Sequence, residues 1–117
     1  MRNFRELDIW KDSIALVKEI YILVDKLPDT EKFGLKSQIS RCVVSIPANI
    51  AEGSAKDSQK DFIRFLQISL GSAFELETHL IICNELSFIS EEEELIIKIN
   101  TLQKRIKALI NYSKKQY

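Results

Sequence analysis

The nine residues Ser45-Ile46-Pro47-Ala48-Asn49-Ile50-Ala51-Glu52-Gly53 place a proline inside a stretch that otherwise has helical periodicity. Proline removes a backbone N–H donor and crowds the carbonyl four residues earlier, which costs about 3 kcal/mol in a helix interior. We predict a helix over residues 33–52 in which Pro47 marks a bend, a helix contact or both, followed by Gly53 as a left-handed cap. The apolar rhythm continues through the proline, because the following side chains share one helical face: Leu35, Ile39, Val43, Ile46 and Ile50.

A first helix is predicted over residues 7–27, ending before Pro28. Its apolar positions cover about half of the helix circumference when projected at 100° per residue. The main stripe steps by four and three residues through Trp10, Ile14, Val17, Tyr21 and Val24, and it is widened by Ile20, Leu23 and Leu27.

Two more helices are predicted in the second half of the chain. Residues 59–86 form the first, and Ser58 with Asp61 provides a variant of the capping box at its start. Residues 91–115 form the second, with a similar signal at Ser90 and an acidic first turn that suits the helix dipole.

The whole chain is predicted to be a single all-α domain over residues 1–117. It contains only three Gly and two Pro, so long elements with short connections are expected. No segment alternates with period two for long enough to form a strand. The expected fold is an antiparallel up-down-up-down four-helix bundle.

The composition indicates a soluble protein with balanced charge. The 17 basic and 17 acidic side chains lack the basic excess typical of nucleic-acid binders. The charged start of the chain does not resemble a signal peptide, and no apolar run approaches the ~18 residues of a membrane span. Without a secretory signal, Cys42 and Cys83 are expected to be reduced core thiols, with a disulfide as the alternative, and the expected location is the cytoplasm.

The helix over residues 59–86 has more apolar surface than a monomeric bundle needs. Its second apolar face is a candidate for self-association, because large exposed apolar patches usually mark protein contacts. The alternative is a central helix that is buried on more than one side. The residues of this candidate oligomer face are Ile63, Leu70, Phe74 and Ile81.

The predicted helix around Pro47 also carries a polar strip with spacings of three and four residues. We interpret it as a hydrogen-bonding seam, in which Ser45 and Asn49 satisfy carbonyls released by the proline and the charged members bridge to a neighbouring helix. The alternative is a ligand groove or an enzyme site using Arg41, Asn49 and Glu52. The complete strip is Gln38, Arg41, Ser45, Asn49 and Glu52.

No catalytic residue, metal ligand set or cofactor motif is predicted. His79 is the only histidine, and although Glu75 precedes it by four residues, metal sites in bundles usually require two carboxylate–histidine pairs. A position at the solvent edge is the simpler interpretation of His79. The two cysteines are too far apart in sequence for a zinc motif.

Charge is uneven along the chain although it sums to zero. Acidic residues gather at Glu85 and at 91–94, whereas no acidic residue follows Glu94. In a symmetric oligomer the basic surface would be repeated around an axis, which keeps RNA or DNA binding open as a second hypothesis. The candidate contacts are Lys98, Lys104, Arg105, Lys107, Lys114 and Lys115.

The sequence resembles the 23S rRNA intervening-sequence family, also labelled S23 ribosomal protein. The similarity extends over essentially the whole chain. The segments that carry it are Phe4–Lys11, Phe33–Leu35 with Gln38-Ile39, Ser45–Gly53, Phe62–Leu66, and Gly71-Ser72 with Glu75–Thr78.

The resemblance implies an antiparallel four-helix bundle that assembles as a homopentamer, without established catalytic residues. A related group serves diversity-generating retroelements as a basic accessory protein that contacts nucleic acid. This chain differs from that group in its balanced charge and in having Ser40, where many relatives place a second basic residue beside Arg41. The leading hypothesis is therefore a non-enzymatic homo-oligomer, and a nucleic-acid-binding accessory protein is the alternative.

Overall fold

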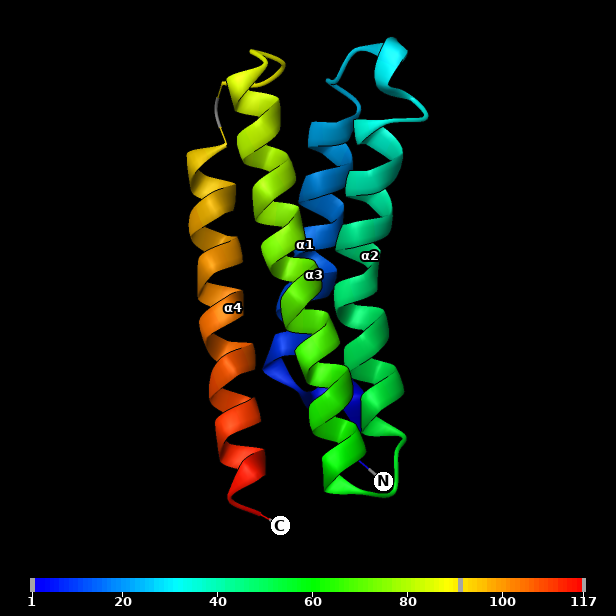
Figure 1. The fold of residues 1–117 in the computed structure, drawn as a ribbon, viewed down its shortest axis with the longest axis vertical. Coiled ribbons are helices and arrows are strands. Elements are labelled where there is room, and N and C mark those ends of the chain that lie inside the picture. The colour runs from blue at the N-terminus through cyan, green and yellow to red at the C-terminus, as the bar shows by residue number, and fades with distance from the viewer. Residues whose placement is uncertain (1, 91, 117) are drawn as a thin grey trace.

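The computed structural model describes residues 2–90 and 92–116, and these form four long helices and two 3-10 turns without a strand. Each long helix runs opposite to the one before it in the chain, and both termini lie at the same end of a bundle 46 Å long (Figure 1). The predicted all-α fold is confirmed. The elements are η1 (Phe4–Glu6), α1 (Asp8–Val24), η2 (Asp29–Glu31), α2 (Leu35–Ser54), α3 (Gln59–Glu85) and α4 (Glu93–Lys114).

The proline-containing segment forms the buried centre of α2. The helix continues through Pro47, which is itself buried, without a break between Leu35 and Ser54. Four of the five predicted apolar positions, Ile39, Val43, Ile46 and Ile50, are 0% exposed, and Leu35 packs against the same core. Full burial of such a side chain contributes about 1.5–3 kcal/mol, so this face outweighs the cost of the proline.

The main apolar stripe predicted for α1 lies at the edge of the core: Val24 is buried in it, and Trp10 and Val17 pack against it. Trp10, Ile14 and Val17 are only partly buried, and Tyr21 is 46% exposed. The residues that were predicted to widen the stripe point into the centre of the bundle. The stripe itself therefore lies on one flank of α1. The core side of α1 consists of Ile9, Leu16, Ile20, Leu23 and Val24.

The start of α3 agrees with the prediction, whereas the start of α4 does not. Ser58 caps α3 by accepting a hydrogen bond from the Asp61 amide at 3.1 Å. The prediction for α4 is wrong, because this helix begins at Glu93 with Glu92 as its N-cap and no side-chain cap bond. Glu91, the predicted first residue, lies outside the described part of the chain.

The predicted end of α1 at Leu27 is also wrong, because the helix stops at Val24. The next residues form hydrogen bonds to the carbonyl three positions earlier, as in a 3-10 turn. The Lys26 amide donates to the Leu23 carbonyl, and the Leu27 amide donates to the Val24 carbonyl. Pro28 follows directly, and a residue before proline disfavours helical geometry.

Gly53 is not the left-handed cap that the sequence predicts. It lies inside α2, and no glycine in the described residues has a positive φ. A Cβ atom at this position would lie 2.6 Å from Cβ of Phe65 on α3. Gly53 is therefore explained by the close approach of α2 and α3.

Candidate functional site

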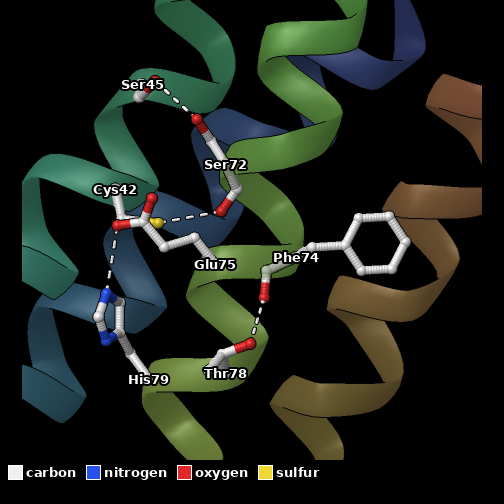
Figure 2. A network of polar contacts seen from close by, with 7 residues as sticks. All are labelled: Cys42, Ser45, Ser72, Phe74, Glu75, Thr78 and His79. Atoms are coloured by element: carbon white, nitrogen blue, oxygen red, sulfur yellow. Dashed lines mark hydrogen bonds and ion pairs between the residues drawn. The ribbon is translucent and has the colours of Figure 1, made fainter.

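The polar strip of α2 forms a hydrogen-bonding seam with α3 through part of its length. The hydroxyls of Ser45 and Ser72 are 2.8 Å apart across the two helices (Figure 2). The Asn49 amide donates to the carbonyl and hydroxyl oxygens of Ser45 at 2.8 and 2.9 Å. The carbonyl released by Pro47 belongs to Val43, four residues earlier, so Asn49 does not satisfy it as predicted.

The other members of the strip do not join this seam. Gln38, Arg41 and Glu52 are exposed, and neither charged residue forms an ion pair within residues 2–90 and 92–116. The predicted bridge to a neighbouring helix is therefore wrong. A hollow of about 330 Å³ lies beside Gln38 and Arg41, but Asn49 and Glu52 do not line it, so the predicted catalytic strip does not converge on one site.

Cys42 lies in the seam and is held in its protonated form. Its Sγ donates to the Ser72 carbonyl at 2.9 Å (Figure 2). Burial, with a smaller contribution from the Glu75 carboxylate, raises the pKa of this thiol from 9.0 to about 12. Burial, and to a lesser degree Glu31, also raises the pKa of Cys83. Both cysteines are buried and unpaired, as predicted, and neither is suited to act as a nucleophile near neutral pH.

His79 is more enclosed than a residue at the solvent edge. Its side chain is 11% exposed, and Nε2 lies 3.2 Å from the Glu75 carboxylate (Figure 2). Its Nδ1 is buried without a hydrogen-bond partner. No cluster of three or more potential metal ligands occurs in the described residues, so this pair does not extend into a metal site.

The predicted oligomer face divides into a buried and an exposed part. Ile63 is 5% exposed and belongs to the core of the bundle, so its assignment to the oligomer face is wrong. Phe74 is 53% exposed and Ile81 is 48% exposed, and Leu70 is partly buried. Figure 2 shows Phe74 pointing to the α4 side of α3, away from the polar seam.

Leu70 and Phe74 line a groove of about 720 Å³ between α3 and α4, which we name the α3/α4 groove. Ala108 adds to its apolar part, and Lys104 and Lys107 stand at its border on α4. Sequence reasoning missed Ala108, because a single alanine among polar residues gives no periodic signal. The remaining lining residues, also missed, are Asn100, Gln103 and Asn111.

Gln103 is the polar residue that attaches α4 to α3 beneath this groove. It is 7% exposed, and its Nε2 donates to the Glu77 carboxylate at 2.9 Å and to the Ala73 carbonyl at 3.3 Å. Its Oε1 accepts from Asn100 at 3.1 Å. The hydrogen-bonding capacity of this buried amide is thus largely satisfied.

The six basic candidates separate into two groups. Lys98 and Arg105 pair with Glu19 and Asp12 of α1 at 2.7 and 2.6 Å, so these two candidates have acidic partners although no acidic residue follows them in the sequence. The hydrogen bond to Glu19 is the main cause of the raised pKa of Lys98. The other group is exposed and forms no ion pair in the described chain: Lys104, Lys107, Lys114 and Lys115.

Charge also separates along the long axis of the bundle. The half with the termini, residues 2–13, 47–71 and 103–116, carries 11 basic and six acidic side chains (Figure 1). The other half, residues 14–46, 72–90 and 92–102, carries six basic and ten acidic side chains. The net charge of zero therefore conceals a basic end and an acidic end.

Comparisons with known proteins identify relatives over most of the chain. The family model described as 23S rRNA-intervening sequence protein matches residues 5–108. The structure is similar to the crystal structure of a protein with unknown function from the S23 ribosomal protein family of Bacteroides thetaiotaomicron, with a TM-score of 0.81 and 29% sequence identity. That similarity covers 88% of this chain and 95% of the other. No curated protein matches the sequence. No helix in the described residues is both long and apolar enough to cross a membrane.

Proposed function

The chain belongs to the 23S rRNA-intervening sequence protein family, and we propose that it is a non-enzymatic helical bundle that self-associates and acts through protein interactions. The family resemblance implies a homopentamer, and we adopt this stoichiometry for the proposal. The two unpaired cysteines suit a reducing compartment, so the proposal places the assembly in the cytoplasm.

The observation that carries the proposal is the exposed apolar lining of the α3/α4 groove. Phe74 leaves 53% of its surface in contact with solvent, and Leu70 and Ala108 lie beside it. Burying an aromatic side chain and its neighbours is favourable by about 25 cal/mol per Å² of apolar surface. A second copy that covers this groove would gain that free energy, less the cost of association.

The non-enzymatic part of the proposal is supported by the chemistry of the polar seam. The Cys42 thiol keeps its proton, because burial raises its pKa to about 12, and its Sγ–H is used in a hydrogen bond to α3. The Ser45 and Ser72 hydroxyls bond to each other rather than to a general base. These groups hold the two helices together.

Light scattering coupled to gel filtration tests self-association. The expected result at micromolar concentration is a single species of several times the chain mass of 13.5 kDa. A species at 13.5 kDa that persists as the concentration is raised would refute the proposal.

A second candidate function is nucleic-acid binding, which the family resemblance implies for the accessory proteins of diversity-generating retroelements. It is favoured by the basic end of the bundle, where Lys107 and Lys114 are exposed and free of ion pairs within residues 2–90 and 92–116. A symmetric assembly of parallel copies would gather these ends and raise the local positive potential.

This second function predicts that a structured RNA or a duplex DNA binds at low salt, with an affinity that falls steeply as salt is added. The double variant Lys107→Gln/Lys114→Gln is expected to weaken binding and to reduce the slope against salt by about two phosphate contacts. Lys18→Gln in the acidic half is the matched control and should bind as the wild type does. Absence of any shift at low salt would exclude this function.

A further inference from the structure

The hollow beside the polar seam differs in chemistry from the α3/α4 groove. It has a volume of about 330 Å³, and none of the described residues that line it is aliphatic or aromatic. Ligand sites span about 300–1,000 Å³, so a ligand of this hollow must be small as well as polar. We name it the α2/α3 hollow, and its lining residues are Gln38, Arg41, Cys42, Ser45, Ser72 and Glu75.

One cation and one anion line the α2/α3 hollow, and they do not pair with each other. Arg41 is exposed and forms no ion pair in the described part of the chain, and the Glu75 side chain is 59% exposed. The other lining residues are neutral near pH 7. Cys42 is among them, because burial raises the pKa of its thiol to about 12. The hollow therefore offers a ligand one positive and one negative group.

The Glu75 carboxylate is held in position and keeps room for a further donor. Its Oε2 lies 3.2 Å from Nε2 of His79, whose side chain is only 11% exposed. In Figure 2 the carboxylate lies next to Cys42, between the His79 ring and the Ser45–Ser72 pair. The Cys42 Sγ–H is donated to the Ser72 carbonyl. Since an ionised carboxylate has about four acceptor positions, Glu75 can still accept from an ammonium group.

The two hydroxyls of the seam leave one hydrogen for a ligand. Asn49 donates to the Ser45 hydroxyl oxygen at 2.9 Å, and the bond between the Ser45 and Ser72 hydroxyls uses one of their two hydrogens. The second hydrogen has no acceptor among residues 2–90 and 92–116. Both hydroxyls line the α2/α3 hollow, so this hydrogen is available to an anionic oxygen placed there, together with the Arg41 guanidinium.

We infer that the α2/α3 hollow binds a small zwitterionic amino acid, with its carboxylate on Arg41 and the free seam hydroxyl and its ammonium group on Glu75. A guanidinium suits a carboxylate because it donates two parallel hydrogen bonds. A ligand with a single charge would leave either Arg41 or Glu75 without a partner, whereas a zwitterion pairs with both. Binding requires no bond to be made or broken, so this site adds to a non-enzymatic function and does not depend on self-association.

Isothermal titration calorimetry of the full chain at low salt tests the site with glycine, β-alanine and 4-aminobutyrate. These probes differ in the separation of their two charges. The best of them is expected to bind with a dissociation constant on the order of 1 mM, because charged contacts act there without an apolar wall. Propionate and ethylammonium each carry only one of the charges, and both are expected to bind about tenfold more weakly than the best zwitterion.

Two charge-removing variants assign the contacts. Arg41→Gln and Glu75→Gln change exposed side chains, and each is expected to weaken binding of the best zwitterion by about tenfold. Arg64→Gln and Glu85→Gln, at exposed positions of α3 outside the hollow, are the matched controls and should bind as the wild type does. Circular dichroism melting verifies that each variant is folded.

The comparison of probes on the wild-type chain is decisive even if a variant does not fold. Failure of all three zwitterions to bind overturns the inference, and so does equal affinity for a zwitterion and its singly charged analogues. Unchanged binding in a folded Arg41→Gln or Glu75→Gln variant overturns it as well. A monomeric wild type would refute the proposed self-association and leave this site standing, because all residues of the hollow belong to one chain.

Discussion

Helix α3 makes two contacts that differ in how closely the helices approach. Toward α2 it presents Ser69 and Ser72, whose hydroxyls bond to the Ile46 carbonyl at 2.9 Å and to the Ser45 hydroxyl at 2.8 Å. Toward α4 it presents Leu70 and Phe74, and a groove of about 720 Å³ remains open between the helices. The α2/α3 contact is filled within the chain, whereas the α3/α4 contact is not.

The difference follows from the size of the side chains on the two sides of one helix. Small residues allow backbones to approach, and Gly53 leaves no room for even a methyl group beside Phe65. On the other side of α3, Phe74 and Lys104 are exposed along the groove, so apolar area remains open there. The α2/α3 contact therefore serves folding, and the α3/α4 contact is available for an interaction.

The largest expected effect comes from Gly53→Ala, which places a methyl group in the α2/α3 contact. Overpacking of this kind costs about 1–3 kcal/mol, and at 2.6 Å from Phe65 Cβ it should exceed the gain in helix propensity. Gly71→Ala on α3 is the matched control, because a Cβ there meets nothing within 4 Å, and it should stabilise by about 0.5–1 kcal/mol. Urea unfolding measures both variants, and an equal gain in both would contradict the close contact.

A smaller loss is expected from Gln103→Ala, which removes the main polar attachment between α4 and α3. The amide bonds to Glu77 and to the Ala73 carbonyl are lost, and we expect the free energy of unfolding to fall by about 1–2 kcal/mol. Asn111→Ala changes an exposed amide of the same groove and should stay within about 0.5 kcal/mol of the wild type. Similar losses in both variants would show that the Gln103 amide holds α4 no more firmly than an exposed amide of the same groove does.

The same contrast explains which features could be predicted from the sequence. The Ser58 cap and the apolar face of α2 were predictable because each signal is contained in a single helix and needs no knowledge of the neighbouring helices. Gly53 was misassigned because its partner, Phe65, is on another helix. A glycine at a helix end is usually a cap, and only the packing of α3 reveals the other reason for it.

The candidate oligomer face was predicted only in part for a related reason. Ile63 and Phe74 lie on one stripe of α3, yet Ile63 is 5% and Phe74 53% exposed. Periodicity gives the direction in which a side chain points, and it cannot give which part of that stripe the rest of the chain covers. The partners of Lys98 and Arg105 were unpredictable as well, because they are 79 and 93 residues away in sequence.

Alkaline pH provides a smaller effect that is specific to the α2/α3 contact. Burial raises the pKa of Cys42 to about 12, so the folded chain keeps a proton that the unfolded thiol loses above pH 9.0. The contribution of the protonated Cys42 thiol to the stability of the folded state is complete below pH 9.0, and it decreases as the pH rises toward about 12. The free energy of unfolding should therefore fall by about 1 kcal/mol more between pH 9 and pH 10 for the wild type than for Cys42→Ala. Parallel pH profiles for the two proteins would contradict the buried thiol, and groups present in both cancel in the difference.

The smallest effect is expected from the exposed ion pairs between α4 and α1. Arg105 and Asp12 are 54% and 45% exposed and their charged groups are 2.6 Å apart, a geometry that contributes about 0.2–1 kcal/mol. A double-mutant cycle with Arg105→Gln and Asp12→Asn should give a coupling in this range that shrinks at 1 M salt, as the Debye length falls to about 3 Å. A cycle of Asp12→Asn with Lys107→Gln is the control and should give no coupling. A large coupling that is insensitive to salt would show that this pair behaves as a desolvated contact, contrary to its exposure, and that α4 is fixed to α1 more firmly than its surface ion pairs imply.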